Sequence, residues 1–162
     1  MEIVNIFEVV KDKLYTVKWD DKEEDEFISL FGDEEKENIG EWQDVEFLKD
    51  FFVQFGSDLR SGFFDVTKTK DAVNKTIAEA EIFKKRFIQL AKNEENLDDL
   101  FQPLTKNAEL YEYEVQKAYG PEYKSWLRIY AIKLADNVYV VTGGAIKLTA
   151  SMNTRPHLKK EL

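Results

Sequence analysis

Two segments at the start of the chain alternate apolar and polar residues in the manner of β-strands. Residues 2–10 (EIVNIFEVV) and 13–19 (KLYTVKW) are rich in β-branched and aromatic residues and adjoin a short KD turn. This pattern predicts a β-hairpin. In its second strand Leu14, Thr16 and Lys18 share one face, and we expect the core to lie on the other face, with Tyr15, Val17 and Trp19.

Helical spacing follows in two segments. Residues 44–55 repeat apolar residues every three or four positions (Val45, Leu48, Phe52, Phe55) and begin at Asp44, a suitable N-cap. Residues 71–92 form the stronger pattern, and the basic run KKR lies in its C-terminal half, where the helix dipole favours cations. Its apolar stripe consists of Val73, Ile77, Ala80, Phe83, Phe87 and Leu90. We therefore predict two helices, followed by a short helical turn at 96–101.

From about residue 111 the pattern becomes that of strands. Four segments alternate and are joined by turn-forming residues: 111–118, 125–134, 137–143 and 145–149. Gly143 and Gly144 are interpreted as a hairpin turn, because glycine adopts positive φ without strain and the pair lacks the Lys-Ser/Thr that a phosphate loop needs. A short helix is expected after Pro156. The order predicts an α+β fold, with a helical pair packed on an antiparallel β-meander, in a single domain of residues 1–162.

Composition excludes several kinds of chemistry. The 162 residues include no cysteine and one histidine, so disulfides, thiol nucleophiles, cysteine–zinc sites and two-histidine metal sites are ruled out. No phosphate-loop, dinucleotide or GxSxG motif is present, and no cofactor or metal is expected. The chain has no apolar run of 18 residues and starts unlike a signal peptide, so we expect no membrane partner and a cytoplasmic location.

The charge is unevenly distributed along the chain. Residues 1–50 hold six lysines and arginines against 17 aspartates and glutamates, whereas residues 111–162 hold eight against five, within a total of −9. Two acidic stretches, 20–27 and 32–42, flank the apolar patch FISLF. They are explained either by a solvated surface with a short helix, or by an acidic surface that binds a basic partner or screens a basic site.

Basic and aromatic residues interleave in the last third of the chain. The set is Lys117, Tyr119, Tyr123, Lys124, Arg128, Tyr130, Lys133, Tyr139, Lys147, Arg155 and His157. Such residues bind phosphates and stack bases, and they can supply the acid, the base and the cationic stabilisation for metal-free RNA cleavage. The alternative is that they alternate outward from a half-buried sheet. If Arg128 lies on a buried face, it needs a polar partner.

The order of these segments resembles the RelE/HigB-type toxins of bacterial toxin–antitoxin pairs, in the HigB-like branch. The resemblance covers residues 44–162, and residues 1–43 form an N-terminal extension with the extra hairpin and the acidic segment. The matching features are Leu100, Pro103 and Leu104; Tyr113 to Val115; Arg128 to Tyr130; Gly143 and Gly144; Lys147 and Thr149; and Pro156. Their joint order carries the resemblance.

The resemblance implies an endoribonuclease that cleaves mRNA, in some relatives on the ribosome, and that an antitoxin protein neutralises. It implies catalytic roles for Arg128 and Lys147 at the scissile phosphate, for His157 as the acid and for Tyr130 in stacking or proton transfer. Arg155 would add a further phosphate contact. Lys117, Lys124 and Lys133, which come from the interleaved basic set, are the other candidates for substrate binding. No DNA partner is expected for this chain alone.

A second hypothesis keeps the fold without the chemistry. In it, the chain is an interaction protein whose acidic N-terminal part binds a basic partner. A metal-dependent hydrolase built on the acidic cluster is a third, weaker reading, because nothing in the sequence selects a pair of carboxylates.

Overall fold

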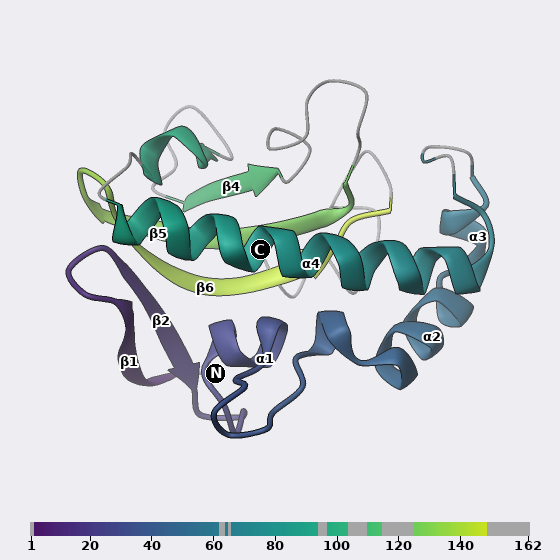
Figure 1. Cartoon of the computed structure of the whole chain (residues 1–162), viewed down its shortest axis with the longest axis horizontal. Coiled ribbons are helices and arrows are strands. Elements are labelled where there is room, and N and C mark those ends of the chain that lie inside the picture. Colours follow the sequence, from purple (N-terminus) through teal and green to yellow (C-terminus); the bar gives the residue numbers. More distant parts are fainter. Residues whose placement is uncertain are drawn as a thin grey trace.

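A mixed β-sheet with helices packed on one face forms the framework of the computed structural model (Figure 1). The structure describes residues 2–61, 64, 66–93, 97–103, 110–114 and 125–148. The strands are β1 (Ile3–Val10), β2 (Leu14–Trp19), β3 (Gln102–Pro103), β4 (Leu110–Glu114), β5 (Leu127–Ala135) and β6 (Val138–Ile146). The helices are α1 (Glu26–Phe31), η1 (Glu41–Gln43), α2 (Val45–Gln54), α3 (Gly56–Leu59), α4 (Thr69–Lys92) and η2 (Leu97–Asp99). The predicted α+β class is confirmed.

The six strands lie in the order β1-β2-β6-β5-β4-β3. The N-terminal hairpin and the β4-β5-β6 meander are antiparallel, but β2 pairs with β6 in parallel, with Thr16 opposite Val141. The predicted hairpin and meander are thus antiparallel as expected, whereas the parallel pairing of β2 with β6 was not predicted. The helices between β2 and the meander carry the chain back across the sheet, so β2 and β6 run in the same direction, and the hairpin extends the sheet.

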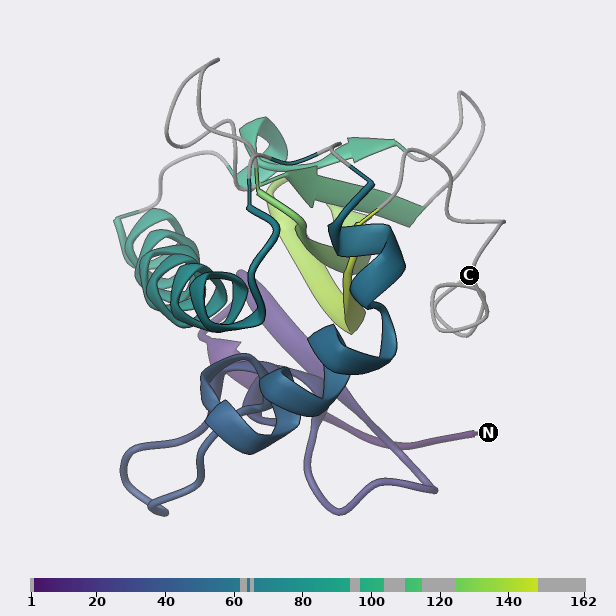
Figure 2. The same cartoon turned by 90° about the vertical axis from the view of Figure 1, so that its right-hand side faces the viewer.

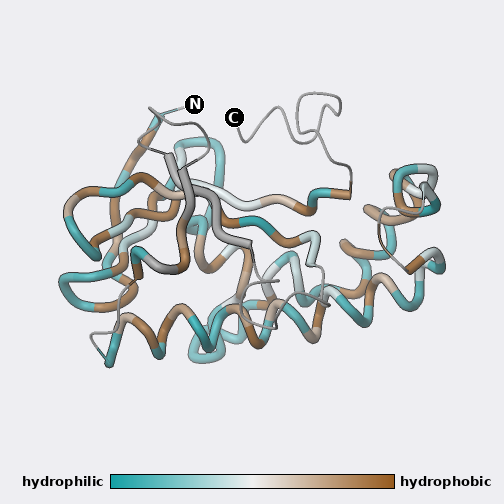
Figure 3. Tube along the Cα trace, turned by 90° about the horizontal axis from the view of Figure 1, so that it is seen from above, coloured by the Kyte–Doolittle hydropathy of each residue, from teal (hydrophilic) through white to brown (hydrophobic). Residues whose placement is uncertain are grey.

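The two predicted helices correspond to α2 and α4. The Asp44 side chain accepts hydrogen bonds from the backbone N–H groups of Glu46 and Phe47, as expected of an N-cap. Figure 3 shows hydrophobic and hydrophilic residues alternating along α4, and its predicted apolar stripe packs into the core. Val45, by contrast, is 57% exposed and does not belong to the buried stripe of α2.

The acidic segment between β2 and α2 contains a buried helix. Asp25 caps α1 by accepting from the Ile28 N–H, and α1 buries Phe27, Leu30 and Phe31. The ring of Phe31 lies 5.4 Å from Trp42 in η1 and 5.8 Å from Phe83 in α4. This aromatic contact joins the acidic segment to the long helix. Figure 2 shows the two helices close together, with α4 seen end-on above α1.

The predicted core face of β2 was wrong. Leu14 is fully buried in the main core, and the Thr16 hydroxyl accepts a hydrogen bond from the Phe27 N–H at 2.9 Å. Val17 on the opposite face is also buried, whereas Tyr15 and Trp19 are half-buried. The reason is α1, which covers the face that the alternation assigned to solvent.

Gly143 and Gly144 do not form a turn. β6 runs through both residues, and the extra residue at Thr142 makes a bulge, because Tyr130 pairs with Gly143 and Ala131 with Val141. The hairpin turn lies earlier, at residues 136–137, where Asn137 has a φ of 62°. The two expected strands are thus one.

Gly144 is required for close packing. A Cβ atom built on it would lie 2.6 Å from Cδ1 of Leu30 and 3.1 Å from Cη2 of Trp42. Both side chains are almost completely buried, so neither can move aside easily. The absence of a side chain at Gly144 lets α1 and η1 rest directly on β6.

Gly144→Ala should therefore lower the free energy of unfolding by about 1–3 kcal/mol, the usual cost of overpacking. Urea denaturation of the full chain measures the change. Val53→Ala, at a position in α2 that is 65% exposed, serves as the control and should have little effect. Equal stabilities of Gly144→Ala and the native chain would contradict the packing role.

Candidate functional site

Half of the residues predicted to bind or cleave RNA lie outside the described part of the chain. These are Lys117, Lys124, Arg155 and His157, together with the helix expected after Pro156. The proposed acid, His157, therefore remains a prediction. The described candidates are Arg128, Tyr130, Lys133 and Lys147.

The register of β5 and β6 determines which of these share a face. Arg128 pairs with Ala145 and Tyr130 with Gly143, and Lys147 follows Ala145 by two positions. Alternation along paired strands therefore brings Arg128, Tyr130 and Lys147 to the same face, opposite the core face that carries Leu127, Ile129 and Ala131. The Lys147 N–H donates to the Trp126 carbonyl at 2.7 Å, which fixes this end of the pair.

Two of these three side chains are buried. Arg128 is 6% exposed, and one guanidinium nitrogen donates to the carbonyl oxygens of Ser125 at 2.8 Å and Leu127 at 2.9 Å. Tyr130 is 1% exposed, and Lys147 is half-buried. Arg128 thus has backbone partners in its buried position, as a charge on a buried face requires. In this conformation Arg128 and Tyr130 present little surface to a phosphate or a base.

Lys133 belongs to the opposite face and is engaged by carboxylates. Its Nζ lies 3.1 Å from Asp98 and 3.6 Å from Asp136. Partial burial acts to raise the pKa of Asp98, but hydrogen bonds from Tyr139, Lys133 and the Asn137 N–H outweigh it and lower that pKa. Lys133 therefore stabilises the β5–β6 turn against η2, apart from Arg128 and Lys147.

A groove of about 680 Å³ lies between α4 and the loop that follows α1. Phe31, Ile77 and Ile88 supply its apolar part. The other lining residues are polar or charged: Asp33, Glu34, Glu35, Asn38, Gln43, Glu81, Lys84, Lys85 and Gln89. We call this feature the acidic groove, because four carboxylates face two lysines there.

The loop that forms one wall of the acidic groove is held closed by backbone contacts. Asp33 and Asn38 exchange two backbone hydrogen bonds of 3.0 and 2.9 Å, and the Asp33 carboxylate accepts from the Glu35 N–H. Gly32 has a φ of 78°, and a Cβ there would lie 2.5 Å from the Asn38 carbonyl oxygen. The loop thus displays Glu34 and Glu35 from a fixed base.

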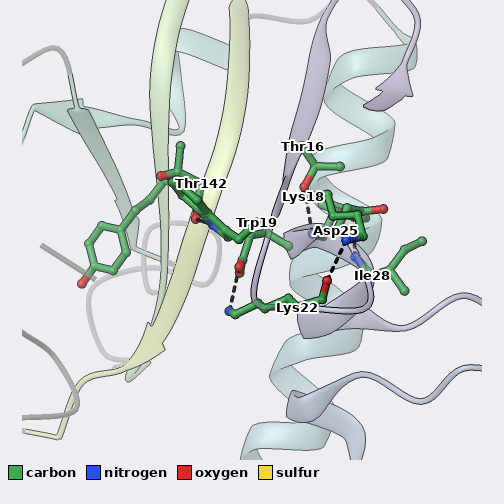
Figure 4. A network of polar contacts seen from close by, with 10 residues as sticks. Thr16, Lys18, Trp19, Lys22, Asp25, Ile28 and Thr142 are labelled. Atoms are coloured by element: carbon green, nitrogen blue, oxygen red, sulfur yellow. Dashed lines mark hydrogen bonds and ion pairs between the residues drawn. The ribbon is translucent and has the colours of Figure 1, made fainter. Parts of the chain in front are cut away.

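Buried carboxylates lie on the other side of α1. Figure 4 shows the polar contacts around Lys22. The Lys18 ammonium donates to the Lys22 carbonyl at 2.7 Å, and the Trp19 indole donates to the Thr142 carbonyl at 3.0 Å. The Lys22 ammonium pairs with Glu26 at 2.7 Å, and Glu26 is 2% exposed. Burial is the main cause that raises the pKa of Glu26, partly offset by Lys22.

Burial also raises the pKa of Asp25, and partial desolvation raises that of Glu41, although the Glu41 side chain is exposed at the surface. Glu41 lines a second pocket of about 310 Å³, where Trp42, Phe47, Phe51 and Phe55 contribute aromatic surface. The negative charge of Glu26 raises the pKa of Glu41 further, whereas the positive charge of Lys22 lowers it. The acidic segment therefore holds carboxylates that are costly to ionise in the folded state.

Within the described residues, no group of three or more histidine, cysteine, aspartate or glutamate side chains is arranged to hold a metal ion. No helix among them is long and apolar enough to cross a membrane. Comparison of the chain with protein-family models, curated proteins and solved structures finds no match. The likeness to RelE/HigB-type toxins therefore rests on the sequence features alone.

The sequence patterns showed that residues 20–42 are acidic, but they did not predict the acidic groove. The groove depends on α4, about 40 residues further along, and on the loop folding back over the end of α1. Gly32 and Gly40, spaced around the acidic run, were the available signal that the loop closes on itself. Glu81 belongs to α4, and no feature of the sequence indicated that it would line the groove.

The buried carboxylates predict a pH dependence. A carboxyl group with a raised pKa binds its proton more tightly in the folded chain, so the free energy of unfolding should rise as the pH falls through the folded pKa toward the unfolded one. This gain is complete below the unfolded pKa of about 4.3 and is lost as pH rises through the folded pKa. Urea denaturation at several pH values measures it.

Glu26→Gln should reduce that rise, because the amide cannot titrate. Glu46→Gln, an exposed substitution in α2, is the matched control and should keep the pH dependence of the native chain. If the free energy of unfolding changes with pH by the same amount in Glu26→Gln and in the native chain, the buried Glu26 carboxyl does not contribute to the pH dependence.

Proposed function

We propose that this chain is a non-catalytic interaction protein that binds a positively charged segment of a partner protein in the acidic groove. The observation that carries the proposal is the combination of apolar surface and carboxylates in one groove. Ile77 and Ile88 offer apolar area, and Glu34 and Glu35 offer charge from the fixed loop. Apolar contact supplies affinity, and the surrounding charges favour basic partners and speed their association.

The chain neutralises this acidic surface only in part, since two lysines, Lys84 and Lys85, face its four carboxylates. The ion pair between Lys22 and Glu26 lies away from the groove. In the groove, Lys85 pairs with Glu81 at 3.2 Å. Uncompensated carboxylates raise the local concentration of cationic partners, an effect that falls as salt rises.

The second candidate function is the metal-independent endoribonuclease. One observation favours it, since register brings Arg128 and Lys147 to the same sheet face. Cleavage would require Arg128 to leave its contacts with Ser125 and Leu127 and reach a phosphate. The interaction function needs no such rearrangement, and for this reason we place it first.

Binding of a lysine-rich 15-residue peptide to the full chain tests the proposed function. The double variant Glu34→Gln/Glu35→Gln should weaken binding on the order of five- to tenfold at low salt, as expected for the loss of two rim charges. Isothermal titration calorimetry gives the affinities. The control Glu46→Gln/Asp50→Asn changes the net charge equally on exposed positions of α2, outside the groove, and should change binding less than twofold. Equal losses in both double variants would mean that only the overall charge matters.

Expression in bacteria tests the ribonuclease. If the chain cleaves mRNA, induced expression should arrest growth, and Lys147→Ala should relieve the arrest while Lys49→Ala on α2 should not. Transcript length measured by primer extension reports cleavage directly. Intact transcripts and identical growth with both variants would remove this candidate.

A further inference from the structure

β1 forms an open edge of the sheet that is unusually apolar. It spans eight residues, IVNIFEVV, with one charged side chain, and it lies at one end of the strand order. Four of its large apolar side chains are exposed: Ile3 by 48%, Val4 by 60%, Ile6 by 51% and Phe7 by 41%. Natural proteins usually protect such an edge with lysines, prolines or bulges. β1 has register irregularities near both ends, but its middle pairs regularly with β2.

One backbone group shows which way this edge faces. The Ile6 N–H donates to the Asn5 side-chain oxygen at 2.8 Å, and therefore does not bond to β2. It is a strand donor at the open edge, occupied by the side chain of its own neighbour. An incoming strand with a carbonyl at this position would replace the Asn5 oxygen, as in strand addition to an exposed sheet edge.

The charge of the chain indicates what kind of strand fits. Residues 1–50 carry a net charge of −11, so pairing β1 with a second copy would bring two strongly acidic halves together. At the start of β1, Glu2 and Asp20 are joined by backbone and side-chain hydrogen bonds, and Asp21 follows. At the other end of the strand, Lys11 and Lys13 accompany Asp12 in the turn. The local charges favour a basic strand end near Glu2. An antiparallel second copy would offer Lys11 and Lys13 there, but the net charge of −11 on residues 1–50 of each copy opposes that pairing, so a basic partner strand is favoured.

We infer that β1 binds an extended segment of a partner protein as an added strand, with apolar side chains against Val4 and Ile6 and lysine or arginine near Glu2 and Asp20. The positive charge of that segment rests on the proposed function, whereas the strand pairing rests on the edge itself. β1 and the acidic groove are distinct surfaces, so they can be tested separately.

The probe is a synthetic 10-residue peptide that alternates valine and threonine and ends in two lysines. Its matched control has the same sequence with alternate backbone nitrogens methylated, which keeps the charge but blocks pairing with a strand edge. Isothermal titration with the full chain at about 0.15 M salt should give binding of the probe and at least tenfold weaker binding of the control. Equal binding of the two peptides would overturn strand addition and would do so without any change to the protein.

Two variants of the chain sharpen the test. Ile6→Pro removes the open-edge donor without removing a β1–β2 hydrogen bond, and should weaken probe binding at least tenfold. Asn5→Ala removes the competing side-chain oxygen and should strengthen binding about fivefold, as expected from one hydrogen bond. Circular dichroism and urea denaturation establish that each variant is folded, and the methylated peptide decides the matter if Ile6→Pro is not.

The outcomes separate the two proposals. If Glu34→Gln/Glu35→Gln weakens binding of the lysine-rich peptide but Ile6→Pro does not weaken binding of the 10-residue probe, the acidic groove is supported as a binding site and the β1 inference is overturned. The reverse would keep strand addition and overturn the groove. A dimer of the full chain by light scattering that Ile6→Pro dissolves would also overturn the inference, because the edge would then pair with a second copy.

Discussion

The close approach of α1 and η1 to β6 at Gly144 is the constraint on which the rest of the structure depends. Leu30 and Trp42 occupy the space that a Cβ would need, and Phe31 continues this contact to Phe83 on α4. Through it, the acidic segment becomes part of the core instead of a solvated addition. The loop that carries Glu34 and Glu35 is consequently held beside α4, which creates the acidic groove.

The same packing explains how far sequence patterns could predict the fold. The capped helix at Asp44 and the stripe from Val73 to Leu90 were predicted correctly, because local signals and burial agree there. The core face of β2 and the turn at Gly143 were predicted wrongly, because α1 and the bulge at Thr142 decide both. The Thr16–Phe27 hydrogen bond joins residues 11 positions apart, and the bulge lies between neighbouring strands of one hairpin, but the alternation of apolar and polar residues marks neither of them.

The candidate site divides in the same way. The sequence indicated that Arg128 would need a polar partner if its face is buried, but it could not show that the face is buried or that the partners are the Ser125 and Leu127 carbonyls. Lys133 fell in the predicted set by composition, yet it is paired with Asp98 and Asp136. The acidic N-terminal part, for which the sequence left open a solvated surface or a partner-binding surface, forms one wall of the acidic groove and the open edge of β1. Charge density was the readable signal, and tertiary packing supplied the shape.

Backbone amide chemical shifts of the full chain, recorded as a lysine-rich peptide is added, test the central claim most directly. The account predicts that the largest changes fall on residues 33–38 and on α4 between Ile77 and Gln89, and that they saturate with one peptide bound. Changes spread evenly over every acidic residue, or confined to β5 and β6 around Arg128 and Lys147, would contradict it.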